Sequence, residues 1–286
     1  MIWSVVTKEE MEGYKIPPVF HNYQEALGRD KISLAVVDAT DDLSFVKRDD
    51  IVLLRTASHD LIKTIRNNGI KSTAEASWAY ELANDKKKLS EFLAKFSIPV
   101  PHQFGIDELN DDTVYFVKPR FGGESFGITE RNICRTKVEA VSMKAKIREE
   151  TSQDVVIEEF IEGVDCTVAC YYKDGEIRTH AIEVECDTKG GIQTHSGKFD
   201  YKEFCVPMKG DSCRHIKKIA KDAFNLLGLK HHARIDFRMS KDGEVYLIDV
   251  NLLPGLGPIA HYSKCLLLTD NMSYRDSLMT IIDSAT

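Results

Sequence analysis

The chain has 286 residues, of which 43% are hydrophobic and 29% charged, and its formal net charge is −7. This composition is that of an ordinary globular protein, and the absence of any basic run longer than residues 86–88 (KKK) argues against a nucleic-acid partner. No apolar stretch approaches the roughly 20 residues of a membrane-spanning helix, and residues 1–6 (MIWSVV) lack the basic start of a secretion signal. We therefore expect a cytoplasmic protein without a membrane partner, with its seven cysteines reduced, that acts on small molecules.

The first eighty or so residues have the texture of a small parallel-sheet lobe. Apolar runs at residues 32–37 (ISLAVV) and 51–54 (IVLL) alternate with helical stretches, as in βα units. Residues 72–75 (STAE) form a capping-box pattern, which predicts the start of the helix that carries Trp78. We expect an N-terminal βα lobe over residues 1–82.

Two further lobes follow, each with its own pattern. Residues 114–117 (VYFV) predict a strand and residues 136–149 a helix, which together indicate a central lobe over residues 83–154. Strands at residues 155–161 and 167–172 begin a C-terminal lobe over residues 155–286.

A long polar stretch interrupts the third lobe. Residues 185–201 contain Gly190, Gly191 and Gly197, and the stretch is too long for a tight turn. Its length and composition are typical of a lid or binding loop.

The most informative motif lies on two strands joined by a hairpin. Residues 233–237 (ARIDF) and 246–251 (YLIDVN) alternate apolar and polar positions, so Arg234, Asp236, Asp249 and Asn251 are expected on one face. Carboxylate and amide oxygens are the ligands that Mg²⁺ bound to phosphates prefers. The alternative interpretation is a pair of strands with solvated acids and a following Pro-Gly turn.

Two weaker motifs precede this one. Residues 117–128 (VKPRFGGESFGI) place a lysine at a strand end before a glycine-rich loop, whose backbone N–H groups could hold phosphates. Residues 155–165 (VVIEEFIEGVD) form a strand, a turn and the start of a second strand, which could present backbone groups to an adenine edge. A plain hairpin and a plain sheet with exposed acids are the respective alternatives.

These three motifs, in this order, resemble the ATP-grasp superfamily, and the Arg-x-Asp, Asp-x-Asn and Pro-Gly elements most resemble its D-alanine–D-alanine ligase branch, over roughly residues 83–260. The resemblance implies an α/β protein with α+β lobes, in which ATP binds between the central and C-terminal lobes of an ATP-grasp fold. It also implies a ligase that activates a small carboxylic acid, such as an amino acid, as an acyl phosphate and joins it to an amine.

By this resemblance, ten residues bind ATP. Lys118 and Lys198 would hold the phosphates, over which the loop of Gly123, Glu124 and Ser125 would close. Glu158 and the backbone of Glu159, Phe160 and Ile161 would contact adenine, and Asp165 would contact the ribose. Asp236, Asp249 and Asn251 would hold two Mg²⁺ ions, with Mn²⁺ as a substitute, while Arg234 and the Gly255 amide would stabilise developing negative charge. Ser90 or one of the lysines at residues 86–88 would provide a further phosphate contact.

The sequence departs from the family pattern at several positions. Glu124 stands where the family has serine, Phe199 where it has tyrosine, and Ala260 where a serine helps to hold the second substrate, while Asp249 replaces a glutamate. The glycine-rich segment that supplies a substrate-binding glutamate is missing from residues 1–30. We therefore expect a product other than D-alanyl-D-alanine. The alternative functions are a small-molecule kinase and a nucleotide-binding protein without activity. The sequence is compatible with a homo-oligomer.

Overall fold

The structure is a computed structural model, and it describes residues 1–13, 16–123, 127–188, 190–193 and 203–285. Its N-terminal lobe is a parallel sheet in the order β2-β1-β3, built from β1 (Ile2–Thr7), β2 (Ile32–Val37) and β3 (Ile51–Leu54). Helices α1 (Lys8–Gly13), α2 (Ile16–Leu27) and α3 (His59–Asn67) accompany it. The sequence patterns identified β2 and β3 but missed the central strand β1, because the buried polar side chains Ser4 and Thr7 break its apolar run.

The central lobe is a small antiparallel sheet in the order β5-β4-β6. Its strands are β4 (Tyr115–Pro119), β5 (Ile133–Cys134) and β6 (Val155–Glu159), with helix α6 (Lys137–Thr151) and 3-10 turns at Ile106–Glu108 and Glu130–Asn132. The boundary expected after residue 154 assigned β6 to the third lobe, but β6 pairs with β4 from Val155 to Glu159. Hydrogen bonding to β4 therefore makes β6 part of the central sheet.

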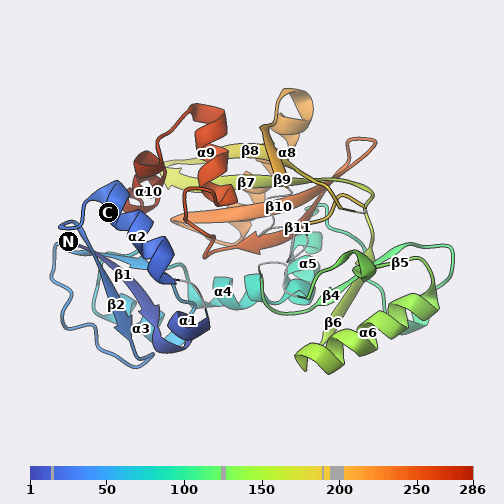
Figure 1. Cartoon of the computed structure of the whole chain (residues 1–286), viewed down its shortest axis with the longest axis horizontal. Coiled ribbons are helices and arrows are strands. Elements are labelled where there is room, and N and C mark those ends of the chain that lie inside the picture. Colours follow the sequence, from blue (N-terminus) through green and yellow to red (C-terminus); the bar gives the residue numbers. More distant parts are fainter. Residues whose placement is uncertain (14–15, 124–126, 189, 194–202, 286) are drawn as a thin grey trace.

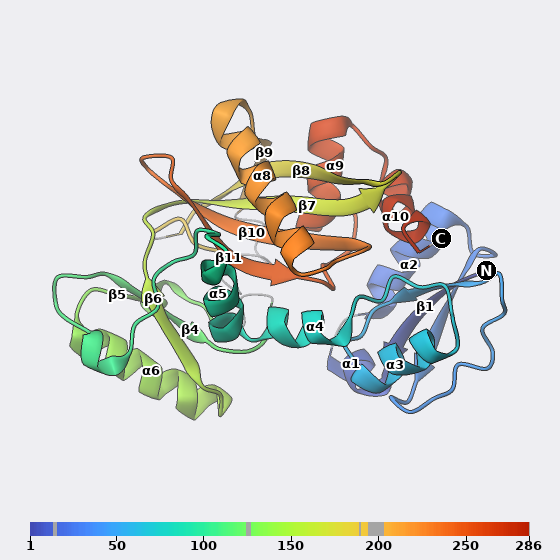
Figure 2. The same ribbon diagram turned by 180° about the vertical axis from the view of Figure 1, so that it is seen from behind.

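The C-terminal lobe is a five-stranded antiparallel sheet in the order β11-β10-β7-β8-β9. Its strands are β7 (Gly163–Lys173), β8 (Glu176–Cys186), β9 (Glu203–Pro207), β10 (His232–Ser240) and β11 (Val245–Asn251). Helix α8 (Gly210–Leu226) covers one face, while α9 (His261–Asp270) and α10 (Tyr274–Asp283) lie on the other (Figures 1 and 2).

Helices α4 (Ser77–Asn84) and α5 (Lys86–Lys95) lead from the N-terminal lobe to the central lobe and run below the C-terminal sheet (Figure 2). The capping-box prediction for residues 72–75 is wrong. Helix α4 begins at Ser77, and its N-cap residue is Ala76, whose side chain makes no capping hydrogen bond. The Glu75 carboxylate instead accepts the backbone N–H groups of Lys230 and His231 at 2.8–3.1 Å. It thereby ties the linker to the start of β10.

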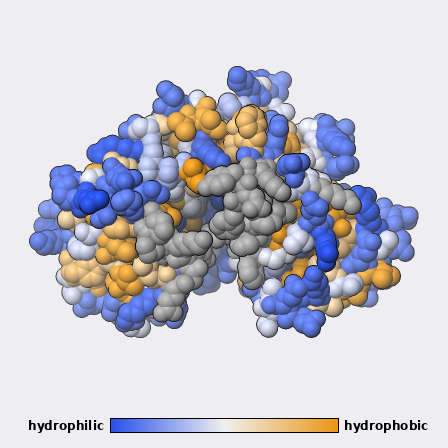
Figure 3. Space-filling model, in the orientation of Figure 1, coloured by the Kyte–Doolittle hydropathy of each residue, from blue (hydrophilic) through white to orange (hydrophobic). Residues whose placement is uncertain are grey.

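The C-terminal helix holds the N-terminal lobe in place. Side chains of α2 and α10 share one hydrophobic core that includes Tyr23, Leu27, Leu278 and Ile281, and both chain ends lie at this side of the molecule (Figure 1). On the face that Figure 3 shows, hydrophilic residues and apolar patches alternate. No helix within the described residues combines the length and apolarity that crossing a membrane requires. The seven cysteines are free thiols in the structure.

Candidate functional site

Strands β10 and β11 bring the four polar residues of the strongest motif to one face. In the antiparallel ladder Asp236 lies opposite Asp249, and Arg234 lies opposite Asn251. The intervening Ile235 and Val250 point the other way into the core. The alternation predicted from the sequence is thus present, and it places two carboxylates, an amide and a guanidinium side by side.

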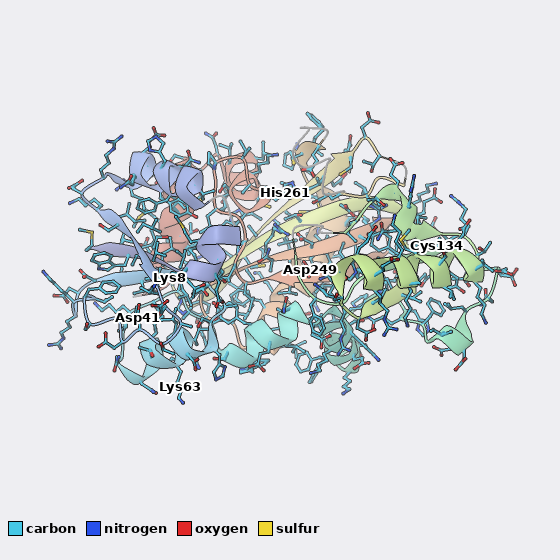
Figure 4. The ribbon with its side chains drawn as sticks, turned by 60° about the horizontal axis from the view of Figure 1, so that its bottom comes forward. Lys8, Asp41, Lys63, Cys134, Asp249 and His261 are labelled. Carbon is cyan, nitrogen blue, oxygen red and sulfur yellow. The ribbon has the colours of Figure 1, made fainter. Side chains whose placement is uncertain are left out.

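Asp236 is held firmly within this group. Arg234 donates to both of its carboxylate oxygens at 2.7–3.0 Å, and Thr167 on β7 donates to Oδ1 at 3.0 Å. Asp249, by contrast, makes no hydrogen bond or ion pair with any residue that the structure describes. It lies near the middle of the molecule, between the C-terminal sheet and the central lobe (Figure 4). Its carboxylate oxygens are therefore the acceptors of this group that remain available for a ligand.

A β-bulge in β11 completes this edge. The register shifts after Asp236, so that Phe237 pairs with Leu247 and Ile248 has no partner in the ladder. The Ile248 carbonyl lies 3.5 Å from Nζ of Lys118, which comes from the central lobe. Bulges commonly redirect backbone groups at active sites. Here the bulge connects the two lobes across the cavity between them.

Lys118 and Glu158 form a buried ion pair on the facing wall. Lys118 on β4 and Glu158 on β6 are 7% and 5% exposed, with Nζ 2.6 Å from Oε1. Burial raises the pKa of Glu158, and the attraction of Lys118 opposes that rise. The carboxylate predicted to bind adenine thus faces the predicted phosphate lysine in this structure.

Lys86 is the member of residues 86–90 that reaches this cavity. It lines the same cavity as Lys118 and Asp249, and its Nζ donates to the Gly122 carbonyl. Burial lowers the pKa of Lys86 despite the nearby Asp249.

The other candidates point elsewhere. Lys87 and Lys88 pair with Glu91 and Asp85 on the outer side of α5, and Ser90 lines only a smaller adjoining cavity. Among Ser90 and the lysines at residues 86–88, Lys86 is therefore the residue placed to contact a phosphate in the cavity.

The segment after β6 forms another wall of the cavity, which Glu159, Phe160, Ile161 and Asp165 line. Gly163 lies between Ile161 and Asp165, and a Cβ there would collide with the Met239 carbonyl on β10, so only glycine permits this close approach. The predicted adenine-binding segment and the predicted ribose-binding residue thus border one cavity with the phosphate lysines.

Two groups of predicted residues remain to be placed. Gly123 lines the cavity beside Gly122, whose φ is +90°, whereas Glu124, Ser125, Lys198 and Phe199 lie outside the described residues. Gly255 is exposed on the loop after β11 and is not among the residues that line the cavity.

Arg55 holds the loop that carries Gly255, and the motifs did not identify it. It directly follows β3, and its Nη2 donates to the carbonyls of Leu253 and Pro254 at 3.3 and 2.7 Å. The sequence could have identified Arg55 as a candidate from its position after the carboxyl end of a parallel strand, because ligands bind at that end of the strands in α/β sheets. Arg55 is the described residue that links the first lobe to the Gly255 loop.

The donor set fits a nucleotide with a hard divalent cation. Lys86, Lys118 and Arg234 supply three positive charges around Asp236 and Asp249, a combination suited to phosphates and Mg²⁺. Asn251 is the third metal ligand predicted. In this structure its Oδ1 accepts a hydrogen bond from the Leu253 N–H at 2.9 Å. No cluster of three His, Cys, Asp or Glu residues suited to a metal occurs in the described part of the chain. Phosphate oxygens would therefore have to complete the coordination shell.

Comparisons with known proteins point to one family. The family model described as the D-ala D-ala ligase C-terminus matches residues 110–283. The D-alanine–D-alanine ligase of Corynebacterium urealyticum is 31% identical over 182 residues, which are 59% of this chain and 48% of that protein. That of Halalkalibacterium halodurans is 27% identical over 217 residues, 71% of this chain and 69% of that protein. The chain thus spans about half to two thirds of the length of these relatives.

Solved structures share the fold over nearly the whole chain. The D-alanine–D-alanine ligase of Bacillus anthracis complexed with ATP has a TM-score of 0.73 at 20% identity and covers 99% of this chain and 96% of its own. The VanG D-Ala:D-Ser ligase of Enterococcus faecalis has a TM-score of 0.74 at 17% identity, with coverages of 100% and 98%. These likenesses confirm the ATP-grasp fold expected from the sequence.

Proposed function

The chain belongs to the D-alanine–D-alanine ligase family, and from this premise we propose that it is an ATP-dependent ligase that joins a small carboxylic acid to an amine. The observation that carries the proposal is the ladder pair Asp236 and Asp249, which faces Lys118 and Lys86 across one cavity. Acidic metal ligands opposite phosphate-binding lysines are what phosphoryl transfer to a carboxylate requires.

In the proposed first step, an oxygen of the substrate carboxylate attacks the γ-phosphorus of ATP. The bond to the β,γ-bridging oxygen breaks, which leaves ADP and an acyl phosphate. Lys86 and Lys118 hold the phosphates, Arg234 neutralises charge on the transferred group, and Asp236, Asp249 and Asn251 are the ligands that would hold Mg²⁺. The cation, as one or two Mg²⁺ ions or as Mn²⁺, supplies Lewis-acid stabilisation of the phosphate oxygens.

In the second step, the neutral amine attacks the acyl carbon. A tetrahedral oxyanion forms, the carbon–oxygen bond to phosphate breaks, and the proton lost by the amine nitrogen passes to the departing phosphate. The Gly255 amide and Arg234 are the donors proposed for the oxyanion, and Arg55 positions the loop that carries Gly255. In this scheme Glu158 and the backbone of Glu159 to Ile161 contact adenine, Asp165 contacts the ribose, and Gly123 lies at the phosphates.

The two substrates are part of the proposal. The replacements at Glu124, Phe199 and Ala260 motivate a product other than D-alanyl-D-alanine. The relatives named above are D-alanine–D-alanine ligases and give this expectation no support. D-Alanine therefore belongs in every substrate panel beside other amino and carboxylic acids.

An omission experiment tests the proposed function. ADP release and product mass are measured with Mg-ATP and each acid alone, each amine alone and each pair, with D-alanine as one of the acids. A ligase releases ADP rapidly only when both a carboxylate and an amine are present, either in two compounds or in a single amino acid such as D-alanine, and yields a product lighter than the two joined molecules together by one water. Rapid ADP release with a single acid and accumulation of a stable phosphorylated product would identify a kinase instead.

A further inference from the structure

Arg238 is a buried arginine of the cavity wall to which the sequence motifs assign no role. It lies on β10 and is 4% exposed. Its Nε donates to the Ile161 carbonyl at 2.9 Å, and its Nη1 donates to Asp165 Oδ1 and to the Gly191 carbonyl, both at 2.7 Å. Its Nη2 donates to the Gly190 carbonyl. One planar side chain thus contacts three separate segments of the cavity wall.

These three segments correspond to three parts of the proposed nucleotide site. Ile161 belongs to the segment proposed for adenine, Asp165 is proposed for the ribose, and Gly190 and Gly191 belong to the polar stretch of residues 185–201. The guanidinium also lies 5.7 Å from the centre of the Phe160 ring. A guanidinium suits this role because it offers five N–H donors in a rigid plane.

Both oxygens of the Asp165 carboxylate are in use. Oδ1 accepts from Arg238, and Oδ2 accepts the Gln193 N–H at 3.2 Å. Burial raises the pKa of Asp165, and the facing guanidinium is the main group that favours its charged form. A ribose hydroxyl that donates to Oδ2 would share this oxygen with the Gln193 amide. Ribose binding and the position of residues 190–193 therefore depend on the same carboxylate.

We propose that Arg238 is a positioning residue of the nucleotide site, which aims the Asp165 carboxylate at the ribose hydroxyls and links ribose recognition to residues 190–193. The inference rests on the proposed function, since it requires that the cavity binds ATP. It goes beyond that function because it assigns nucleotide specificity to a residue that does not take part in phosphoryl transfer.

The test compares nucleotides that differ only in the ribose. Dissociation constants of the full chain are measured calorimetrically, in Mg²⁺ and without acid or amine, for ATP, 2′-deoxy-ATP and 3′-deoxy-ATP. The variants are Arg238→Met, Arg238→Lys and Asp165→Asn. Because Arg238→Met leaves a buried carboxylate unpaired and can unfold the chain, the double variant Asp165→Asn/Arg238→Met, which buries no charge at this site, is measured as well.

The ratio of the dissociation constants for deoxy-ATP and ATP is the readout. The unaltered chain should prefer ATP over at least one deoxynucleotide by about tenfold, as expected for a hydrogen bond to a charged acceptor. Arg238→Met, Asp165→Asn and the double variant should bring this ratio close to one, while Arg238→Lys should restore only part of it. In nucleotide-free Arg238→Met, the amides of Gly191 and Gln193 should also exchange hydrogen faster.

Other outcomes would overturn the inference. If the folded variants bind all three nucleotides more weakly by the same factor, the ratio of dissociation constants stays unchanged. Arg238 then has only a structural role, and the proposed ligase function is unaffected. If the unaltered chain binds no ATP at all, both proposals fail. Arg178→Met, which removes an exposed pairing with Glu176 on β8, is the control and should change neither the ratio nor the exchange.

Discussion

Asp249 lies directly opposite Asp236 in the β10–β11 ladder, yet only Asp236 is held by neighbouring side chains. Arg234 and Thr167 use the oxygens of Asp236, whereas Asp249 forms no hydrogen bond with the described residues. Directly opposed like charges destabilise a sheet, and Arg234 offsets the charge of Asp236 while no described side chain forms an ion pair with Asp249. The pair is therefore better explained by ligand binding than by stabilisation of the fold.

Replacing Asp249 should stop turnover and leave the fold intact. Asp249→Asn removes a proposed metal ligand without removing any hydrogen bond between described residues, so ADP release should fall by on the order of 10²–10³-fold. The melting temperature should stay within a few degrees. Asp242→Asn, in the turn between β10 and β11, is the matched control. Turnover of Asp249→Asn within twofold of the unaltered chain would refute the metal assignment.

Lys86 and its neighbour Lys87 should behave differently. Lys86→Met removes a positive charge from the cavity wall, so the Kd for Mg-ATP should rise by about tenfold or more. Lys87→Met changes an exposed side chain whose partner is Glu91 and should leave the Kd unchanged. Calorimetry on both variants, with Ser90→Ala beside them, decides among the candidates. Equal Kd values for Lys86→Met and the unaltered chain would contradict this placement.

Arg55 should affect the rate of the reaction more than the binding of ATP. Arg55→Met removes two hydrogen bonds that hold the Leu253–Pro254 backbone next to Gly255. A displacement of about 1 Å at an oxyanion donor can cost roughly 10²-fold in rate, so kcat should fall while the KM for ATP stays nearly constant.

Arg275→Met serves as the control for this prediction, because Arg275 also donates to two consecutive backbone carbonyls, at Ala26 and Leu27, away from the cavity. Its kcat should match that of the unaltered chain. If Arg55→Met and Arg275→Met lowered kcat equally, the effect would reflect general loosening of the first lobe.

Glu75 should make stability depend on pH. Burial raises the pKa of Glu75 to about 7. The backbone N–H groups of His231 and Lys230, which stabilise the charged carboxylate, oppose this rise. The folded chain therefore holds this proton more tightly than the unfolded chain. The resulting stabilisation is complete below a pH of about 4.5 and is lost as the pH rises to about 7, by roughly 3 kcal/mol in total.

Urea unfolding at several pH values between 4.5 and 8 measures this effect. Buried histidines with lowered pKa, such as His231 and His232, change stability in the opposite direction. The difference between the unaltered chain and Glu75→Gln removes their contribution. The free energy of unfolding of the unaltered chain minus that of Glu75→Gln should fall as the pH rises and should become constant above about 7. A difference independent of pH would show that Glu75 does not titrate in this range.

Features with local signals could be predicted from the amino-acid sequence. Alternation along residues 233–237 and 246–251 was sufficient to place Arg234, Asp236, Asp249 and Asn251 on one face, because side-chain direction in a strand follows from position alone. The ATP-grasp fold was expected from the resemblance of the three motifs to a known family, and the solved structures confirm it.

Only the tertiary structure decided which distant groups meet. Glu75 reads as part of a helix cap, but it binds amides 155 and 156 residues away. Arg238 meets Asp165 across 73 residues, and Arg55 reaches Pro254 across 199. A buried carboxylate or guanidinium must find a partner when it leaves water, but many acceptors along the chain can satisfy it. Which one does so depends on how the lobes pack, and no local pattern encodes that.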